Sequence, residues 1–156
     1  DIEGAEDEDA LIAETPAADD PRLLKRGLSH SGFDLGLAAF FRRMRRRGAN
    51  RVVVTDGADG AWLSERKTLT FMPTLKTEVM GTAGAGDAFA STLAARLAQG
   101  AQAEAALRAA TINAAAAVSE ADTQSGLLDR AAIDARAEDA AEGLTAARWR
   151  WAADDG

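Results

Sequence analysis

The sequence contains no cysteine, and its 156 residues include one histidine and three prolines. Without cysteine there is no disulfide framework, no thiolate zinc site and no cysteine nucleophile. The single His30 excludes a site built from several histidines and argues against a Ser-His-Asp triad. No apolar run approaches the roughly 20 residues that span a bilayer, and no basic-then-apolar signal segment opens the chain. These absences favour a cytoplasmic protein with no membrane partner.

Acidic residues outnumber basic ones by 25 to 18, which gives a formal net charge of −7. An acidic balance argues against nucleic acid as the main partner, because phosphate binding needs a basic field. Hydrophobic residues make up 47% of the chain, which is enough for a folded core. We expect residues 1–22 to form an acidic arm, or a remnant of the preceding part of a longer domain, with a short helix over residues 7–13 as an alternative.

Hydrophobic periodicity predicts alternating helices and strands and hence an α/β layer architecture. Gly48 ends the first predicted helix, and Asp129 is a plausible N-cap for the last. The tail 142–156 has no clear assignment. The predicted elements are helices over residues 33–47, 85–97, 103–119 and 129–141 and strands over residues 51–54, 61–63, 68–72 and 75–79.

Six arginines lie between Arg42 and Arg51, at the end of the first predicted helix. One interpretation is a surface that binds nucleic acid or another polyanion. The other is a solvated helix face whose cations interact favourably with the helix dipole. The acidic net charge favours the second interpretation.

The sequence GTAGAGDAF over residues 81–89 follows a predicted strand and opens a predicted helix. Glycines allow a ligand close to the backbone, and unpaired amides at a helix start can hold a phosphate. The segment lacks the lysine that a Walker A loop needs after Gly86, and Phe89 stands where a dinucleotide fingerprint needs glycine. Asp87 would repel a phosphate, so it is either a general base that takes a proton from a substrate hydroxyl or a helix cap.

The extended motif GTAGAGDAFAS closely resembles the C-terminal signature of the ribokinase-like PfkB sugar kinases, commonly Asp-Thr-Thr-Gly-Ala-Gly-Asp-Ala-Phe. Residues 52–61 are similar to the family's Val-Val-Thr-Leu-Gly-x-x-Gly segment, and residues 109–126 to its late helix and loop. The three segments occur in the same order and with the same spacing as in the family, and the resemblance covers residues 33–140. It implies the C-terminal part of a truncated ribokinase-like three-layer α/β/α fold, with residues 23–141 as the nucleotide-binding half and 142–156 as a tail.

The resemblance implies an ATP-dependent transferase that phosphorylates a hydroxyl of a sugar or nucleoside with the help of Mg²⁺. Asp87 would be the catalytic base. The resemblance places Asn113 near the adenine; the alternative is that Asn113 is a small polar residue tolerated in a packed helix. For Thr55, the alternative to nucleotide binding is a turn at the end of a strand. The implied site residues are Gly84, Ala85 and Gly86 for the anion hole and Thr55, Gly57, Gly60 and Asn113 for the nucleotide.

Two departures from the family pattern bear on metal binding. Gly81 stands where the family usually has an aspartate that helps to bind a monovalent cation, which puts potassium activation in doubt. The family's Asn-x-x-Glu magnesium motif has its nearest match at residues 5–8, where Ala5 replaces the asparagine. Only Glu8 remains as a candidate metal ligand. The alternative is that Glu8 is one of many acidic residues in an acidic arm and binds no metal.

Family members are considerably longer, and their sugar site comes mostly from the N-terminal half. We therefore expect an exposed sheet edge and apolar surface that favour self-association or pairing with a missing N-terminal half. The alternative function is that of a non-catalytic nucleotide- or partner-binding fragment of a split or decayed kinase.

Overall fold

A computed structural model describes residues 10–11, 19–30, 33–65, 67–122 and 124–150 of the chain. The chain forms two compact units: a sheet unit of residues 1–71 and 147–156, and a helical unit of residues 72–146. Among the described residues, no helix is both long and apolar enough to cross a membrane. The elements are β1 (Ala10–Leu11), α1 (Arg22–Arg26), β2 (Leu28–His30), β3 (Phe33–Leu35), α2 (Leu37–Arg46), β4 (Arg51–Thr55), the 3₁₀ turn η1 (Gly57–Asp59), β5 (Ala61–Glu65), β6 (Thr68–Met72), α3 (Ala85–Ala98), α4 (Ala103–Val118), α5 (Arg130–Asp139) and β7 (Ala147–Arg150).

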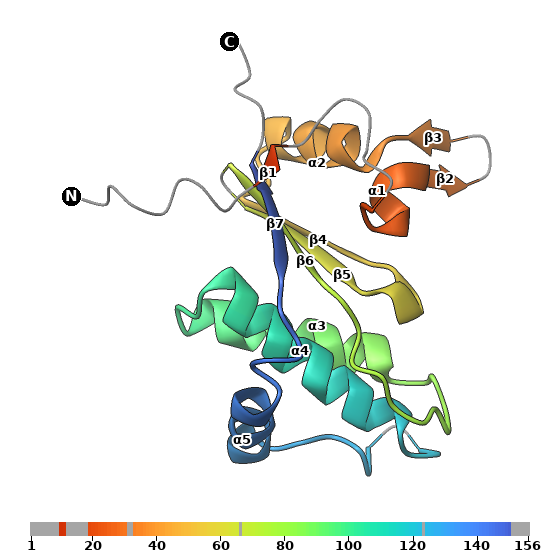
Figure 1. The fold of residues 1–156 in the computed structure, drawn as a ribbon, viewed down its shortest axis with the longest axis vertical. Coiled ribbons are helices and arrows are strands. Elements are labelled where there is room, and N and C mark those ends of the chain that lie inside the picture. The colour runs from red at the N-terminus through yellow and green to blue at the C-terminus, as the bar shows by residue number, and fades with distance from the viewer. Residues whose placement is uncertain (1–9, 12–18, 31–32, 66, 123, 151–156) are drawn as a thin grey trace. The chain divides into compact units, whose positions relative to one another are not determined.

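The sheet unit contains a five-stranded sheet with the order β1-β7-β6-β5-β4 (Figure 1). β4 pairs antiparallel with β5, and β6 pairs antiparallel with β7, whereas β1 runs parallel to β7. β2 and β3 form a separate antiparallel pair. The β-branched run predicted as a strand over residues 51–54 is confirmed as β4, and the two predicted strands that follow are confirmed as β5 and β6.

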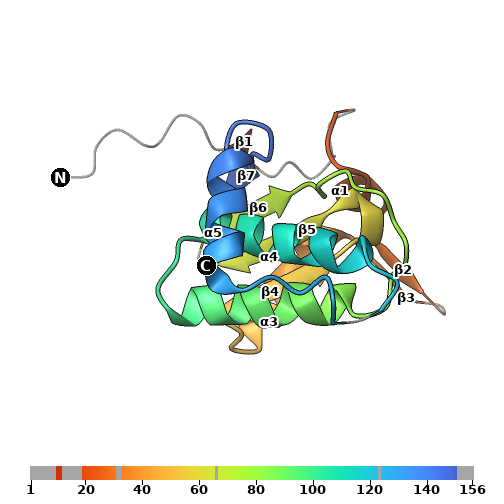
Figure 2. The same ribbon diagram turned by 90° about the horizontal axis from the view of Figure 1, so that it is seen from below.

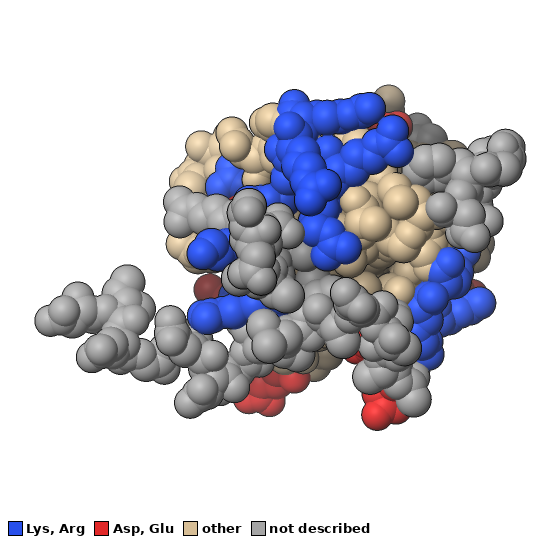
Figure 3. Space-filling model, turned by 90° about the horizontal axis from the view of Figure 1, so that it is seen from above, with Lys and Arg blue, Asp and Glu red and all other residues tan. Residues whose placement is uncertain are grey.

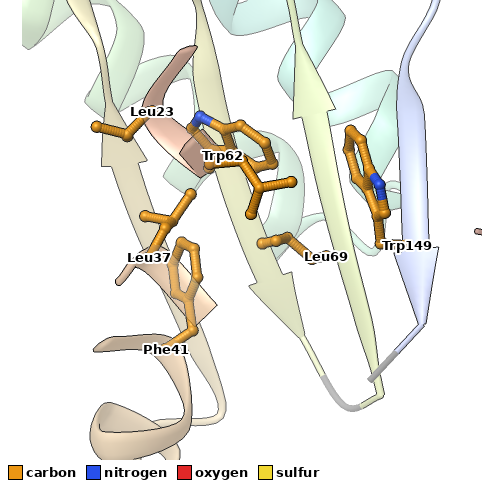
Figure 4. Close-up of a cluster of buried hydrophobic side chains, with 7 residues drawn as sticks. Leu23, Leu37, Phe41, Trp62, Leu69 and Trp149 are labelled. Atoms are coloured by element: carbon orange, nitrogen blue, oxygen red, sulfur yellow. The ribbon is translucent and has the colours of Figure 1, made fainter. Parts of the chain in front are cut away.

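A cluster of apolar side chains from α1, α2 and three strands forms the core of the sheet unit (Figure 4). The indole of Trp62 is fully buried, and its ring centroid lies 4.7 Å from that of Phe71 and 5.4 Å from that of Trp149. The apolar stripe that predicts α2 supplies the cluster from the helix side, while the arginines of α2 stay outside it. The buried members are Leu23, Leu24, Leu37, Phe41, Trp62, Leu69 and Trp149.

The helical unit is built on α3 and α4, which lie side by side, and α5 contacts α4 (Figure 2). α4 is rich in alanine and almost wholly buried, because small side chains let two helices approach closely. α5 begins where the sequence predicts, since the Asp129 carboxylate accepts a hydrogen bond from the amide of Ala132 at 2.8 Å. An ion pair at 2.5 Å joins Arg96 of α3 to Asp134 of α5.

Two predicted elements are wrong in part or in full, and so is one alternative. The alternative of a short helix over residues 7–13 fails at Ala10–Leu11, which forms a strand, and its other residues lie outside the described residues. The helix predicted over residues 33–47 begins only at Leu37, because Phe33–Leu35 pairs with β2. Residues 75–79 form no strand, because no strand within the described residues supplies hydrogen bonds to them.

Candidate functional site

The motif over residues 81–89 forms the start of α3, as the sequence predicts. Gly84 is the N-cap, with φ of 82°, a left-handed conformation that favours glycine. The first helical hydrogen bond runs over 2.8 Å from the amide of Ala88 to the carbonyl of Gly84. The amides of Ala85, Gly86 and Asp87 therefore have no acceptor within the helix. With the helix dipole behind them, these amides are suited to an anion.

The approach to this helix start is open at Gly86. Gly86 is exposed, and a Cβ added to it would meet no atom within 4 Å. The absence of a side chain therefore leaves room in front of the amides. It also means that a larger residue at this position would project into that space without disturbing the helix.

Asp87 is exposed on the first turn of α3 and is the acidic residue of that turn. Within the described part of the chain, no hydrogen bond or ion pair is recorded for its carboxylate, whereas its backbone carbonyl accepts one from the hydroxyl of Ser91 at 2.7 Å. The cap of α3 is Gly84, so the capping alternative for Asp87 does not describe this helix. The carboxylate therefore lies exposed on the same helical turn as the anion-suited amides.

Asn113 of α4 joins three parts of the helical unit. Its side-chain nitrogen donates to the hydroxyl of Thr92 on α3 at 2.8 Å, and its side-chain oxygen accepts from the amide of Leu128 at 3.0 Å. The residue is only 5% exposed, so both polar ends of its amide bind inside the protein. This geometry matches the alternative of a polar residue in a packed helix. Thr92 and Leu128 are partners that sequence reasoning missed.

The loop over residues 119–128 is held against α4 by local contacts. A Cβ on Gly126 would overlap the carbonyl oxygen of Ala116, so only glycine allows this approach. The Asp122 carboxylate accepts hydrogen bonds from the hydroxyl and amide of Ser125, at 2.6 and 2.7 Å, and from the amide of Gln124 at 2.8 Å. These bonds hold the pKa of Asp122 below its ordinary value of 3.8.

The surroundings of Gly81 bear on whether a monovalent cation could bind here. A Cβ at Gly81 would lie 3.4 Å from the carbonyl oxygen of Glu120 and 3.6 Å from that of Ala121. Backbone oxygens therefore approach this position, but no carboxylate accompanies them at residue 81. The described residues also hold no group of three or more His, Cys, Asp or Glu side chains that could bind a metal ion. Glu8, the candidate magnesium ligand, lies outside the described residues.

Three of the other predicted nucleotide-binding residues lie in the sheet unit, at the turn between β4 and β5. Thr55 is the exposed last residue of β4, Gly57 opens η1, and Gly60 precedes β5. The amide of Asp56 donates to the carbonyl of Gly60 at 2.8 Å, which closes the turn. An ion pair between the side chains of Asp56 and Arg26 ties the turn to α1, a contact that the sequence did not predict.

The arginines predicted near the end of α2 lie there. Figure 3, seen from the side on which α2 lies in Figure 1, shows Lys and Arg side chains gathered on one face. Arg43, Arg46 and Arg47 are exposed, and α2 contains no acidic residue. Arg51 forms a 2.8 Å ion pair with Glu65. The placement near the helix end agrees with the dipole interpretation, and polyanion binding stays a prediction.

Comparisons with known proteins now bear on this geometry. The model of the pfkB family carbohydrate kinases matches residues 36–130. The chain is 29% identical to ribokinase from Thermotoga maritima (TM-score 0.55, covering 60% of this chain and 32% of that one). It is 28% identical to the Burkholderia thailandensis nucleoside kinase solved with inosine (TM-score 0.57, covering 62% and 33%). A search of curated proteins finds no match.

The same fold occurs in Arabidopsis thaliana ribokinase complexed with ribose and ATP, at 23% identity (TM-score 0.58, covering 63% of this chain and 32% of that one). The chain thus spans about a third of the length of these related structures. The matched range contains β4, its following turn, α3 and α4. The family match covers well over half of the chain, and we conclude that the chain belongs to the pfkB family of carbohydrate kinases and has a ribokinase-like α/β fold.

Proposed function

We propose that this chain supplies the nucleotide-phosphate site of a kinase that transfers the γ-phosphate of ATP to a hydroxyl of a sugar or nucleoside. The observation that carries the proposal is the start of α3. There, three amides without helical acceptors and the unpaired carboxylate of Asp87 lie within one helical turn. This turn falls inside the range that matches the carbohydrate kinase family.

In the proposed reaction, the amides of Ala85, Gly86 and Asp87 donate hydrogen bonds to the oxygens of the phosphoryl group as it moves. Asp87 accepts the proton of the acceptor hydroxyl while the hydroxyl oxygen forms a bond to the γ-phosphorus. The bond between that phosphorus and the β,γ-bridging oxygen breaks, and ADP leaves. Mg²⁺ would be held by the nucleotide phosphates together with one or two protein carboxylates, for which Glu8 is the candidate.

The turn after β4, which belongs to the sheet unit, is a separate proposed nucleotide-binding segment. Thr55 is exposed and carries a hydroxyl, and Gly57 is exposed without a side chain, whereas Gly60 is buried and would act by closing the turn through its carbonyl. Asn113 has a different role in this proposal. Because its amide is buried and bonded to Thr92 and Leu128, it would shape the loop beside the site rather than bind the base directly.

The test is phosphate transfer from ATP to a panel that includes ribose and inosine, the molecules bound in two of the related structures. Asp87→Asn should lower transfer by a factor of about 10² to 10⁴, because a general base contributes that much. The same substitution should leave ATP binding intact or tighten it, since it removes a negative charge beside the phosphates. Full activity of the Asp87→Asn variant would overturn the proposed base.

A second candidate is a nucleotide-binding chain without turnover. The observation that favours it is Gly81, which brings no carboxylate to a position that the backbone oxygens of Glu120 and Ala121 approach. This candidate predicts saturable ATP binding with no transfer to any acceptor by the parent chain. Transfer that appears only when a separately expressed N-terminal half is added would favour the kinase proposal instead.

A further inference from the structure

The chain between β6 and α3 contains a segment with the apolar–polar alternation of a strand, which pairs with no strand among the described residues (Figure 1). Residues 75–80 are all exposed, and Leu75, Val79 and Met80 keep 39%, 58% and 62% of their surfaces accessible. In the described part of the chain, no backbone hydrogen bond is recorded for residues 75–79. Peptide groups and apolar side chains are therefore presented together, which is the property of an unpaired sheet edge.

This segment is fixed to the helical unit at its C-terminal end. The amides of Met80 and Gly81 both donate to the carbonyl of Val118 at the end of α4, at 2.8 and 3.3 Å. The hydroxyls of Thr77 and Ser119 lie 3.5 Å apart. Anchoring lowers the entropy that pairing would cost, because one end of the segment is already held in place.

The order of side chains in the segment is complementary to itself. Residues 75–79 read Leu-Lys-Thr-Glu-Val. An antiparallel pair of two copies centred on Thr77 would place Lys76 opposite Glu78 of the other copy. It would also place Leu75 opposite Val79 and the two Thr77 side chains opposite each other. Opposite charges, apolar pairs and threonine pairs are all favourable across antiparallel strands.

We propose that a second copy of this chain pairs with residues 75–79 in this antiparallel register and forms a two-fold symmetric dimer. The two-fold axis makes the charged pair and the apolar pair each occur twice, while the Thr77 pair lies on the axis and occurs once, so each dimer gains two ion pairs and two apolar pairs. Neither Lys76 nor Glu78 takes part in a recorded ion pair among the described residues, so both charges are available. This proposal does not depend on the proposed kinase activity.

The experiment is sedimentation equilibrium of the 156-residue chain over a wide concentration range, with charge variants. Lys76→Glu and Glu78→Lys each place like charges opposite one another at both positions, and each should weaken the dimer about tenfold or more. The double variant that exchanges both charges should dimerise like the parent. Lys67→Glu changes the net charge by the same amount as Lys76→Glu, at an exposed position outside the segment, and serves as the matched control for that variant.

The strongest result is expected from mixing the two single variants. Each alone would be largely monomeric, and together they would form a mixed dimer, because acidic positions then face basic ones. Far-ultraviolet circular dichroism of each variant shows whether the fold is kept. A parent chain that stays monomeric at all concentrations would overturn the proposal, and so would a dimer that is equally stable in all the variants.

Discussion

Substitution of Asn113 tests whether its buried amide holds the helical unit together. Asn113→Ala would leave the Thr92 hydroxyl and the Leu128 amide without the partners that they now have at 2.8 and 3.0 Å. A buried polar group left unpaired costs about 1–3 kcal/mol, which applies to the Thr92 hydroxyl, and the partly buried Leu128 amide should cost about 1 kcal/mol, at the low end of that range. We therefore expect a loss of about 2–4 kcal/mol in the free energy of unfolding, out of about 5–15 kcal/mol for a typical domain. The melting temperature should fall by about 4–16 °C.

Two probes can follow the two units separately. All three tryptophans lie outside residues 72–146, so tryptophan fluorescence reports on the sheet unit. Most helical residues belong to α3, α4 and α5, so far-ultraviolet circular dichroism reports mainly on the helical unit. Asn113→Ala should shift the circular dichroism transition, and the fluorescence transition will follow only if both units unfold together.

The matched control for Asn113 is Thr92→Val, which keeps the shape of the side chain and removes one of the two hydrogen bonds. It should cost roughly half as much as Asn113→Ala, and the double variant should cost less than the sum of the two because they share one bond. A loss below about 0.5 kcal/mol for Asn113→Ala would contradict the reasoning, since a surface substitution has an effect of that size.

Three further predictions concern other parts of the fold. Phe41→Ala removes a fully buried ring from the sheet-unit core and should cost about 3–5 kcal/mol, and an unchanged fluorescence transition in denaturant would refute this. Gly126→Ala would push a Cβ into the carbonyl of Ala116, so the circular dichroism midpoint should fall, and a midpoint equal to that of the parent would contradict the close packing. The ionised carboxylate of Asp122 stabilises its turn fully above pH 3.8, and this contribution is lost as the pH falls through the lowered pKa. Protection of the Ser125 amide, measured as the ratio of the intrinsic to the observed hydrogen-exchange rate, should therefore fall in acid. In the Asp122→Asn variant, protection of the Ser125 amide should no longer depend on pH. An acid dependence equal to that of the parent would exclude Asp122 as the cause.

The elements predicted correctly are those whose signals are local. The valine run of β4, the helical spacing in α3 and α4, and Asp129 as the cap of α5 each depend on residues close together in the sequence. The elements predicted wrongly depend on partners far along the chain. Residues 75–79 have the alternation of a strand without a neighbouring strand, and β7 lies in the tail that the sequence left unassigned.

The candidate site divides in the same way. The helix start at Gly84 and the exposed Asp87 follow from one continuous motif, and the structure has both where the sequence predicts them. The environment of Asn113 could not be predicted, because its partners lie 21 and 15 residues away. Packing of α3, α4 and the following loop brings these groups together, and no spacing rule in a single sequence indicates it.

The measurement that tests the central claim most directly is calorimetric titration of ATP with Mg²⁺ into the parent chain and into Gly86→Asp and Gly86→Ala. Space at Gly86 is open, so both side chains fit, and only the aspartate adds a negative charge in front of the α3 amides. We predict saturable binding by the parent, a similar affinity for Gly86→Ala, and binding about tenfold weaker or more for Gly86→Asp. Equal affinity for all three chains, or no binding by a cooperatively folded parent, would contradict a phosphate site at the start of α3.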